Sequence, residues 1–261
     1  MAKGNLAACL AVTLKHEGGW SDHPKDPGGA TMKGVTLATF RRYYPGATKA
    51  ELRAISQADV ERIYSDGYWR KVAGDALPFG LDLAVFDYGV NSGPSRGVKT
   101  LQAEIGAKVD GDAGAETINK AASVDVKRAI QGICARRMSF LRALGTWQTF
   151  KRGWSARVAD IEVKAVSMWL DRGGKVSETD KRVLREEADK AGKTASVQQK
   201  GAGGTATAGG GIGAGDLVAT GDANWLLLGG IALAVVAVAG LLTYKARHNR
   251  ERARAYSEAA A

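Results

Sequence analysis

The segment of residues 16–36 carries the side chains whose types and spacing could do chemistry. It reads HEGGWSDHPKDPGGATMKGVT. Glu17 stands at the end of an expected helix, and the two glycines after it allow a sharp exit that leaves its carboxylate facing a cleft. A second carboxylate, Asp26, comes nine residues later in a stretch rich in glycine, proline and threonine. Thr31 and Thr36 follow, with a glycine between them.

Two carboxylates that face one cleft are the minimal equipment for hydrolysis of a glycosidic bond. One must be protonated to assist the leaving oxygen, and the other must be ionised to orient water, act as nucleophile or stabilise positive charge. We expect Glu17, between apolar helix residues and Trp20, to hold its proton, and Asp26, in a solvated turn, to stay ionised. A surface glutamate near a helix end followed by an ordinary turn fits the same residues. Spacing alone leaves both interpretations open.

The elements that must position these side chains are mainly helical. Periodicity predicts helices over residues 5–16, 36–44, 48–66, 80–91, 95–105, 113–121, 124–143 and 154–170. Two helix starts carry caps, Thr48 with Glu51 and Ser56 with Asp59. Residues 18–35 break the periodicity with glycines and prolines, which indicates turns and short strands. The predicted fold class is therefore α+β, mainly α, with a small irregular β lobe and a helical lobe.

The chain changes character after residue 172. Residues 177–200 are highly charged and predict a short solvated helix, with a partner-binding helix as the alternative. Residues 201–215 read GAGGTATAGGGIGAG, which is typical of a flexible linker. Residues 225–244 carry no charge and have an aromatic residue at each end, so they predict a single C-terminal transmembrane helix. The predicted organisation is a catalytic region at 1–80, a helical region that completes the cleft at 81–172, a charged helix and linker at 173–224, the span at 225–244 and a basic tail at 245–261.

The predicted membrane topology is at odds with the N-terminal sequence. The arginines of the tail favour the cytoplasmic side, which places the N-terminal domain outside. Leu6-Ala7-Ala8-Cys9 resembles a lipoprotein cleavage box, but only five residues precede it, too few for the apolar region of a conventional export signal. We expect a single-pass protein of the bacterial inner membrane whose catalytic domain acts on the periplasmic side, with the export route open.

Composition excludes several other classes of protein. Only two cysteines and three histidines are present, so neither a disulfide framework nor a histidine-rich metal centre is expected. The net charge of +10 suggests an anionic partner such as nucleic acid, anionic lipid or the bacterial wall. We see no helix-turn-helix signature and no basic stripe interleaved with aromatics, so no nucleic-acid partner is expected. We expect no metal and no cofactor.

Several motifs together resemble a known family. They are EGGW at 17–20, DPGGAT at 26–31, GVT at 34–36, FDYGVNSGP at 86–94, LQ at 101–102, VDGDAG at 109–114, ARR at 135–137, FKRGW at 150–154 and Arg157. In combination they closely resemble the family 108 glycoside hydrolases, which are peptidoglycan-cleaving muramidases of phages, prophages and some secretion systems. The resemblance covers roughly residues 5–170. One departure is Met32-Lys33, where the family often has Asn-Tyr, which puts sugar stacking at that position in doubt.

The resemblance implies a lysozyme-like domain that cleaves the β-1,4 bond between N-acetylmuramic acid and N-acetylglucosamine, in the manner of an endolysin. The family's catalytic glutamate falls on Glu17, and a looser analogy with phage lysozymes gives Asp26 and Thr31 the task of placing or activating water. The implied substrate-binding residues are Trp20, Thr36, Asp87, Tyr88 and Asn91. The implied partners are peptidoglycan glycan strands and, through residues 225–244, the inner membrane.

Alternative functions stay open at this point. A lytic transglycosylase manages with one glutamate, and Asp26 argues mildly against it. A wall-docking or membrane-disrupting protein without catalysis is the third possibility. Trp69 and Trp154 could stack on sugars, but we expect them in the core. Asp110-Gly111-Asp112 predicts a turn rather than a calcium site.

Overall fold

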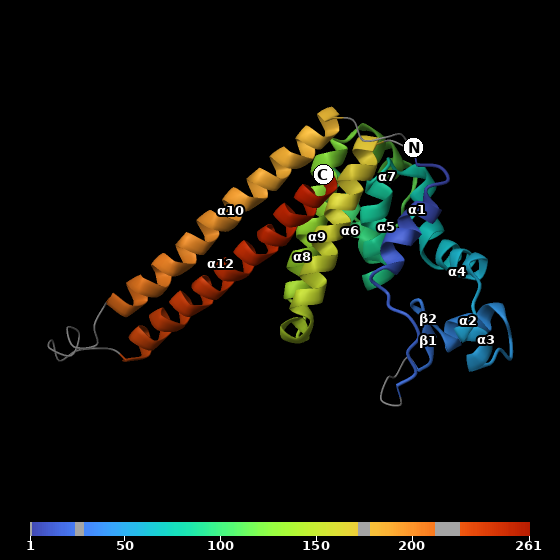
Figure 1. Ribbon diagram of the computed structural model, residues 1–261, viewed down its shortest axis with the longest axis horizontal. Helices are drawn as coiled ribbons and strands as arrows, with labels where there is room; N and C mark the ends of the chain where they lie inside the picture. The colour runs from blue at the N-terminus through green and yellow to red at the C-terminus, as the bar shows by residue number, and fades with distance from the viewer. Residues whose placement is uncertain (1, 24–28, 172–177, 212–224) are drawn as a thin grey trace. The chain divides into compact units, whose positions relative to one another are not determined.

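The structure is a computed structural model that describes residues 2–23, 29–171, 178–211 and 225–261 (Figure 1). Side chains are described outside residues 204–236. The chain divides into two compact units, Met1–Val176 and Ser177–Ala261. We describe each unit by itself.

The first unit is built from helices joined by short turns. In chain order the helices are α1 (Leu6–Leu14), α2 (Leu37–Tyr43), α3 (Lys49–Arg53), α4 (Gln57–Tyr64), α5 (Leu81–Ser92), α6 (Pro94–Ile105), α7 (Ala115–Ser123), α8 (Val126–Arg142) and α9 (Trp147–Asp171). Between α4 and α5 the chain forms three short helical turns, Ser65–Trp69, Arg70–Val72 and Gly74–Ala76. The helix predicted over 48–66 is divided in two, because Ser56 starts α4 by accepting a hydrogen bond from the Asp59 amide. The predicted capping box of Thr48 and Glu51 at the start of α3 is confirmed.

The core of this unit surrounds α5, which is buried on all sides from Leu81 to Gly89. Helices α6, α8 and α9 contact α5. Helix α6 can approach it closely because Gly97 has no side chain: a Cβ there would lie only 2.8 Å from the Val85 carbonyl oxygen. Trp69 is 2% exposed and packs edge-on against Phe86, with ring centroids 5.4 Å apart. The prediction of a core role for Trp69 is therefore confirmed.

In the residues that the structure describes, the expected β lobe is a small hairpin with one isolated bridge, between Ser21 and Thr31. Strand β1 (Thr31–Met32) pairs antiparallel with β2 (Val35–Thr36), and Thr31 lies opposite Thr36. The two residues of the turn, Lys33 and Gly34, both have positive φ, as a type I′ turn requires. The α+β class is therefore wrong. The two strands have only two residues each and the other described elements are helices, so the fold is predominantly helical, consistent with a lysozyme-like helical domain.

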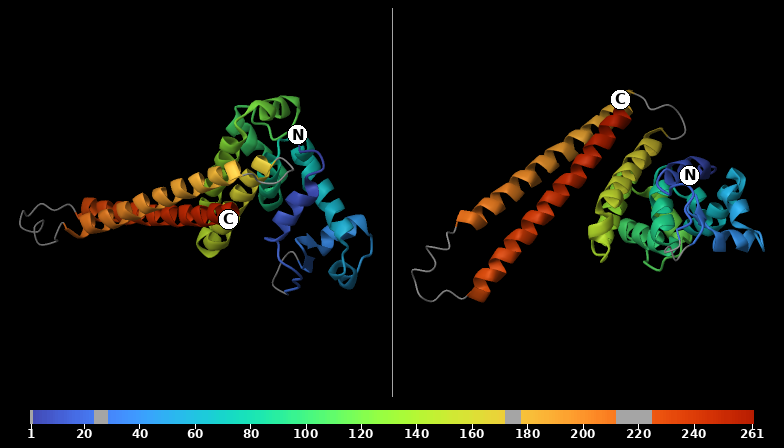
Figure 2. Two further views of the ribbon diagram at one scale, coloured as in Figure 1. Left: turned by 45° about the horizontal axis from the view of Figure 1, so that its top comes forward. Right: turned by 60° about the horizontal axis from the view of Figure 1, so that its bottom comes forward.

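The second unit is a pair of long antiparallel helices, α10 (Glu178–Gly211) and α12 (Trp225–Ala260), which lie side by side in every view (Figure 2). Asn249 donates to Gln198 at 3.0 Å, and Arg250 donates to Gln199 at 2.5 Å. Small and apolar side chains fill the seam, namely Leu184, Ala188, Ala191, Ala195, Ala246, Tyr256 and Ala260. The helix expected to be short and solvated is thus long and packed. The predicted linker is helical as far as Gly211, and its last residues lie outside the described part of the chain.

The predicted transmembrane helix over residues 225–244 is also wrong. Among the helices of the described residues, none combines the length and the apolar character needed to cross a membrane. The apolar run is the first part of α12, which does not stop at Tyr244 but continues through the basic tail and pairs with α10. The side chains of 225–236 lie outside the described residues. The inner-membrane location that depended on this span is corrected with it.

Candidate active site

Glu17 lies just beyond the last turn of α1, in a geometry that the backbone enforces. The amides of Lys15, His16 and Glu17 donate to carbonyls three residues earlier, so the helix tightens as it ends. Gly18 then takes the left-handed conformation, with φ of 65°, which turns the chain away from the helix axis. The Glu17 side chain remains one-fifth exposed. A carboxyl group is therefore held at the surface at the point where the helix leads into the hairpin.

A row of four charges runs from this carboxyl into the core. Arg157 of α9 donates through NH2 to Glu17 Oε1 at 2.7 Å. The same guanidinium forks onto Asp87 of α5, with Nε to Oδ2 at 3.1 Å and NH2 to Oδ1 at 2.8 Å. Arg137 of α8 completes the row by donating to Asp87 Oδ2 at 2.6 Å. The row links the surface carboxyl to three helices that cross the core.

Burial and charge act in opposite directions on the Asp87 carboxyl. Its side chain is fully buried, which by itself would raise the pKa. The guanidiniums of Arg137 and Arg157 outweigh this and hold the pKa at about 2. Burial would likewise lower the pKa of Arg157, but Asp87 and Glu17 raise it above its ordinary value. The buried charges therefore persist because each has a partner of opposite sign.

A hydrogen bond fixes the residue next to Glu17. His16 Nε2 lies 2.9 Å from Asp160 Oδ2. Asp160 and Arg157 are three residues apart in α9, so they share one side of the helix. Two consecutive residues at the end of α1 are thus each held by α9.

The turn of the hairpin also lies against Glu17. A Cβ built at Gly34 would lie 3.1 Å from Glu17 Oε2 and would collide with the Tyr64 hydroxyl. Tyr64 donates to the Lys33 carbonyl oxygen at 2.9 Å, which anchors the turn. Burial and the charge of Glu17 raise the pKa of both Tyr64 and Tyr68, so these hydroxyls keep their protons.

Of the three predicted catalytic residues, the structure places Glu17 at the end of α1 and Thr31 in the hairpin, and it does not describe Asp26. Thr31 lies in β1, three residues before Gly34, and its hydroxyl donates to the Gly29 carbonyl oxygen at 3.1 Å. Thr36, opposite it, caps α2 by accepting from the Thr39 amide at 3.2 Å. Asp26 lies outside the described residues.

The predicted substrate-binding residues fall into two groups. Trp20 is partly exposed beneath the guanidinium of Arg53, 5.6 Å from the ring centroid, and Asn91 is exposed at the end of α5. Asp87 and Tyr88 are buried, and Arg137 lies over the Tyr88 ring at 5.2 Å. In this structure these two side chains support the site from inside, and their contact with substrate stays a prediction.

Sequence reasoning gave no role in the site to Arg157, Arg137, Tyr64 or Gly34. A usable signal existed for the two arginines. Both occupy positions on the buried faces of their helices, where a charge needs a partner of opposite sign. Asp87 lies within the apolar sequence of α5, so it is a buried negative charge of the kind that these two arginines need as a partner.

Metal ligands are not gathered anywhere in the described residues, where no group of three or more His, Cys, Asp or Glu is placed to hold an ion. The Asp110-Gly111-Asp112 segment is organised by the buried Gln102. Its side-chain amide donates to Asp110 Oδ1 at 2.7 Å and to the Asp112 carbonyl at 2.9 Å, and its oxygen accepts from two backbone amides of the segment. This segment is a structural turn.

Comparisons with known proteins point to one family of hydrolases. The family model described as glycosyl hydrolase 108 matches residues 10–93, which include Glu17 and Asp87. The solved structure of SagA from Brucella abortus is 40% identical in sequence, with a TM-score of 0.59, and the match covers 65% of this chain and 98% of that one. No curated protein matches the chain. The chain therefore belongs to the glycosyl hydrolase 108 family and is a glycoside hydrolase of the peptidoglycan-degrading type.

Proposed function

We propose that the chain is an N-acetylmuramidase that cleaves the β-1,4 bond between N-acetylmuramic acid and N-acetylglucosamine, with Glu17 as the general acid. One observation carries the proposal. The Glu17 carboxyl is one-fifth exposed at the junction of α1 and the hairpin, and it is held by Arg157, which is itself paired with the buried Asp87. A carboxyl held in one geometry before substrate arrives is what proton transfer to a leaving oxygen needs.

The two oxygens of Glu17 have different surroundings. Oε1 accepts from Arg157, so the proton delivered to the glycosidic oxygen is carried on Oε2. Gly34 lies beside Oε2, and the absence of a side chain there keeps that oxygen accessible to a sugar. Arg157 thus orients the acid without blocking the oxygen that acts.

The second half of the reaction needs an attacking water. We assign its placement to Asp26 as the ionised carboxylate and to the Thr31 hydroxyl, on the strength of their spacing from Glu17. Trp20, Thr36 and Asn91 are proposed as contacts to the glycan. The wall-degrading role of an endolysin is part of the same proposal.

The test uses the full chain and purified peptidoglycan, with mass spectrometry of the released fragments. Wild type should release fragments with reducing muramic ends, and Glu17→Gln should release none while keeping its fold by circular dichroism. Glu116→Gln, an exposed glutamate in α7, is the matched control and should behave as wild type. Anhydromuramic ends would assign a lytic transglycosylase instead. Absence of fragments from folded, wall-bound wild type would leave a docking protein.

A further inference from the structure

The first two turns of α9 carry three aromatic rings outside the core. Phe150 is 49% exposed, and Trp147 and Trp154 are partly exposed. The Phe150 and Trp154 rings are stacked with centroids 5.4 Å apart, and Trp147 lies 6.1 Å from Trp154. We call these three residues the aromatic row. The expectation that Trp154 belongs to the core is not met, because it lies where α9 leaves the core.

The aromatic row shares a helix face with the arginine that holds Glu17. Trp147, Phe150, Trp154 and Arg157 are spaced by three, four and three residues, which places them along one side of a helix. At a rise of about 1.5 Å per residue, Trp154 lies about 4.5 Å and Trp147 about 15 Å along the axis from Arg157. The row therefore leads outward from the active site to the surface.

The surroundings of the row are open and basic. Residues 148–153 are all exposed, and nothing lies within 4 Å of a Cβ built at Gly153. Lys151 and Arg152 add positive charge beside the rings. An exposed aromatic patch with a polar rim is typical of a ligand-binding surface.

We propose that the aromatic row binds sugar rings of a peptidoglycan glycan strand next to the Glu17 site, as an extension of the substrate cleft. The inference rests on the proposed function for the identity of the substrate. The apolar C–H faces of pyranose rings pack on flat aromatic rings, and neighbouring rings of the row have centroids 5.4 and 6.1 Å apart, so the three rings form one continuous aromatic surface. Lys151 and Arg152 suit the lactyl carboxylates that muramic residues carry where the stem peptide has been removed. Continuity with Arg157 selects the glycan, rather than a separate partner, as the occupant.

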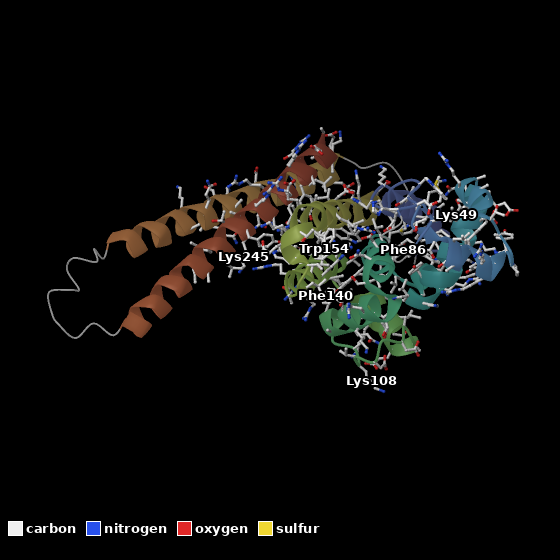
Figure 3. All side chains as sticks on the ribbon, turned by 90° about the horizontal axis from the view of Figure 1, so that it is seen from below. Lys49, Phe86, Lys108, Phe140, Trp154 and Lys245 are labelled. Atoms are coloured by element: carbon white, nitrogen blue, oxygen red, sulfur yellow. The ribbon has the colours of Figure 1, made fainter. Side chains whose placement is uncertain are left out.

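The experiment measures binding without cleavage, in full-length Glu17→Gln protein. Peptide-free glycan strands, prepared by removing the stem peptides enzymatically, are titrated while tryptophan fluorescence is followed. Phe150→Ala should weaken binding about tenfold, and Phe150→Tyr, which keeps the ring, should bind as the parent does. Val109→Ala is the matched control because Val109 is also an exposed hydrophobic residue, at 54%. It neighbours Lys108, which lies well away from Trp154 in Figure 3.

Three outcomes would overturn the inference. They are unchanged glycan binding by Phe150→Ala, an equal loss in Val109→Ala, and a loss confined to isolated stem peptides. If Phe150→Ala bound glycan as the parent does but melted at a lower temperature, the result would show instead that the row packs against another part of this chain. Failure of the proposed function gives a different result: the row would still bind glycan, but the wild-type chain would release no reducing muramic ends.

Discussion

Replacement of Asp87 by asparagine tests whether the buried charges organise the first unit. The change keeps the size of the side chain but removes the charge that Arg137 and Arg157 share. The Arg137 side chain is only 1% exposed, so it cannot recover its hydration when its partner is lost. Breaking a buried pair from one side typically costs about 3–5 kcal/mol.

The pKa of Asp87 gives a second measure of the same interaction. A pKa of about 2 in place of the ordinary 3.8 corresponds to about 2 kcal/mol of stability at neutral pH, at about 1.36 kcal/mol per pKa unit. The folded-state pKa is lowered, so this stability is fully present above about pH 4 and is lost as the pH falls toward about 2. Asp87→Asn should therefore cost at least about 2 kcal/mol at pH 7 and should remove part of the pH dependence in that window.

Urea unfolding followed by tryptophan fluorescence measures both effects, because five of the six tryptophans lie in the first unit. The matched control is Asp66→Asn. Asp66 pairs with Arg70 at the surface, so its loss should cost less than about 0.5 kcal/mol. A free energy of unfolding for Asp87→Asn within 0.5 kcal/mol of wild type at pH 7 would refute the argument.

Three further substitutions probe the same unit. Burial raises the pKa of Asp82 to about 6, so between about pH 4 and 6 the unfolded state binds fewer protons than the folded state, and wild-type stability falls as the pH rises through that window. Asp82→Asn should flatten this pH dependence and leave the protein at least as stable as wild type at pH 7, as measured by urea unfolding. Gly34→Ala places a methyl group against Glu17 and the Tyr64 hydroxyl at positive φ, so wall-clearing activity should fall more than tenfold while secondary structure by circular dichroism is kept. Tyr64→Phe removes the hydrogen bond to Lys33 and should cost about 1 kcal/mol in urea, and unchanged stability would show that the turn does not need it.

Much of the helical framework could be predicted from local sequence. Periodicity located the helices of the first unit, and short-range caps at Thr48 and Ser56 marked two of their starts. Local signals sufficed because each depends on residues within one or two turns. The same signals failed at the hairpin, where glycines and threonines indicated a lobe but the described residues form two short strands.

The rest required contacts between distant segments. A glycine-rich run predicts a linker by composition, yet α10 continues to Gly211 while paired with α12, and packing outweighs low helix propensity. Hydropathy at 225–244 suggested a membrane span because a window of that length does not include the basic tail that continues the same helix. The charges of Asp87 and Arg157 were visible, but the sequence does not say which of the other charges each one meets.

The active site is assembled from the two ends of the first unit. The ion pair that holds Glu17 joins residues 140 positions apart, and the hydrogen bond at His16 spans 144. A ribosome must therefore complete α9 before the acid at the start of the chain acquires its support. Contacts of such long range form late in folding, because closing a long loop costs entropy before the contact can stabilise it. A growing or truncated chain that ends before Arg157 thus carries the Glu17 segment without its partner, so hydrolytic competence is expected only once nearly the whole first unit has been made.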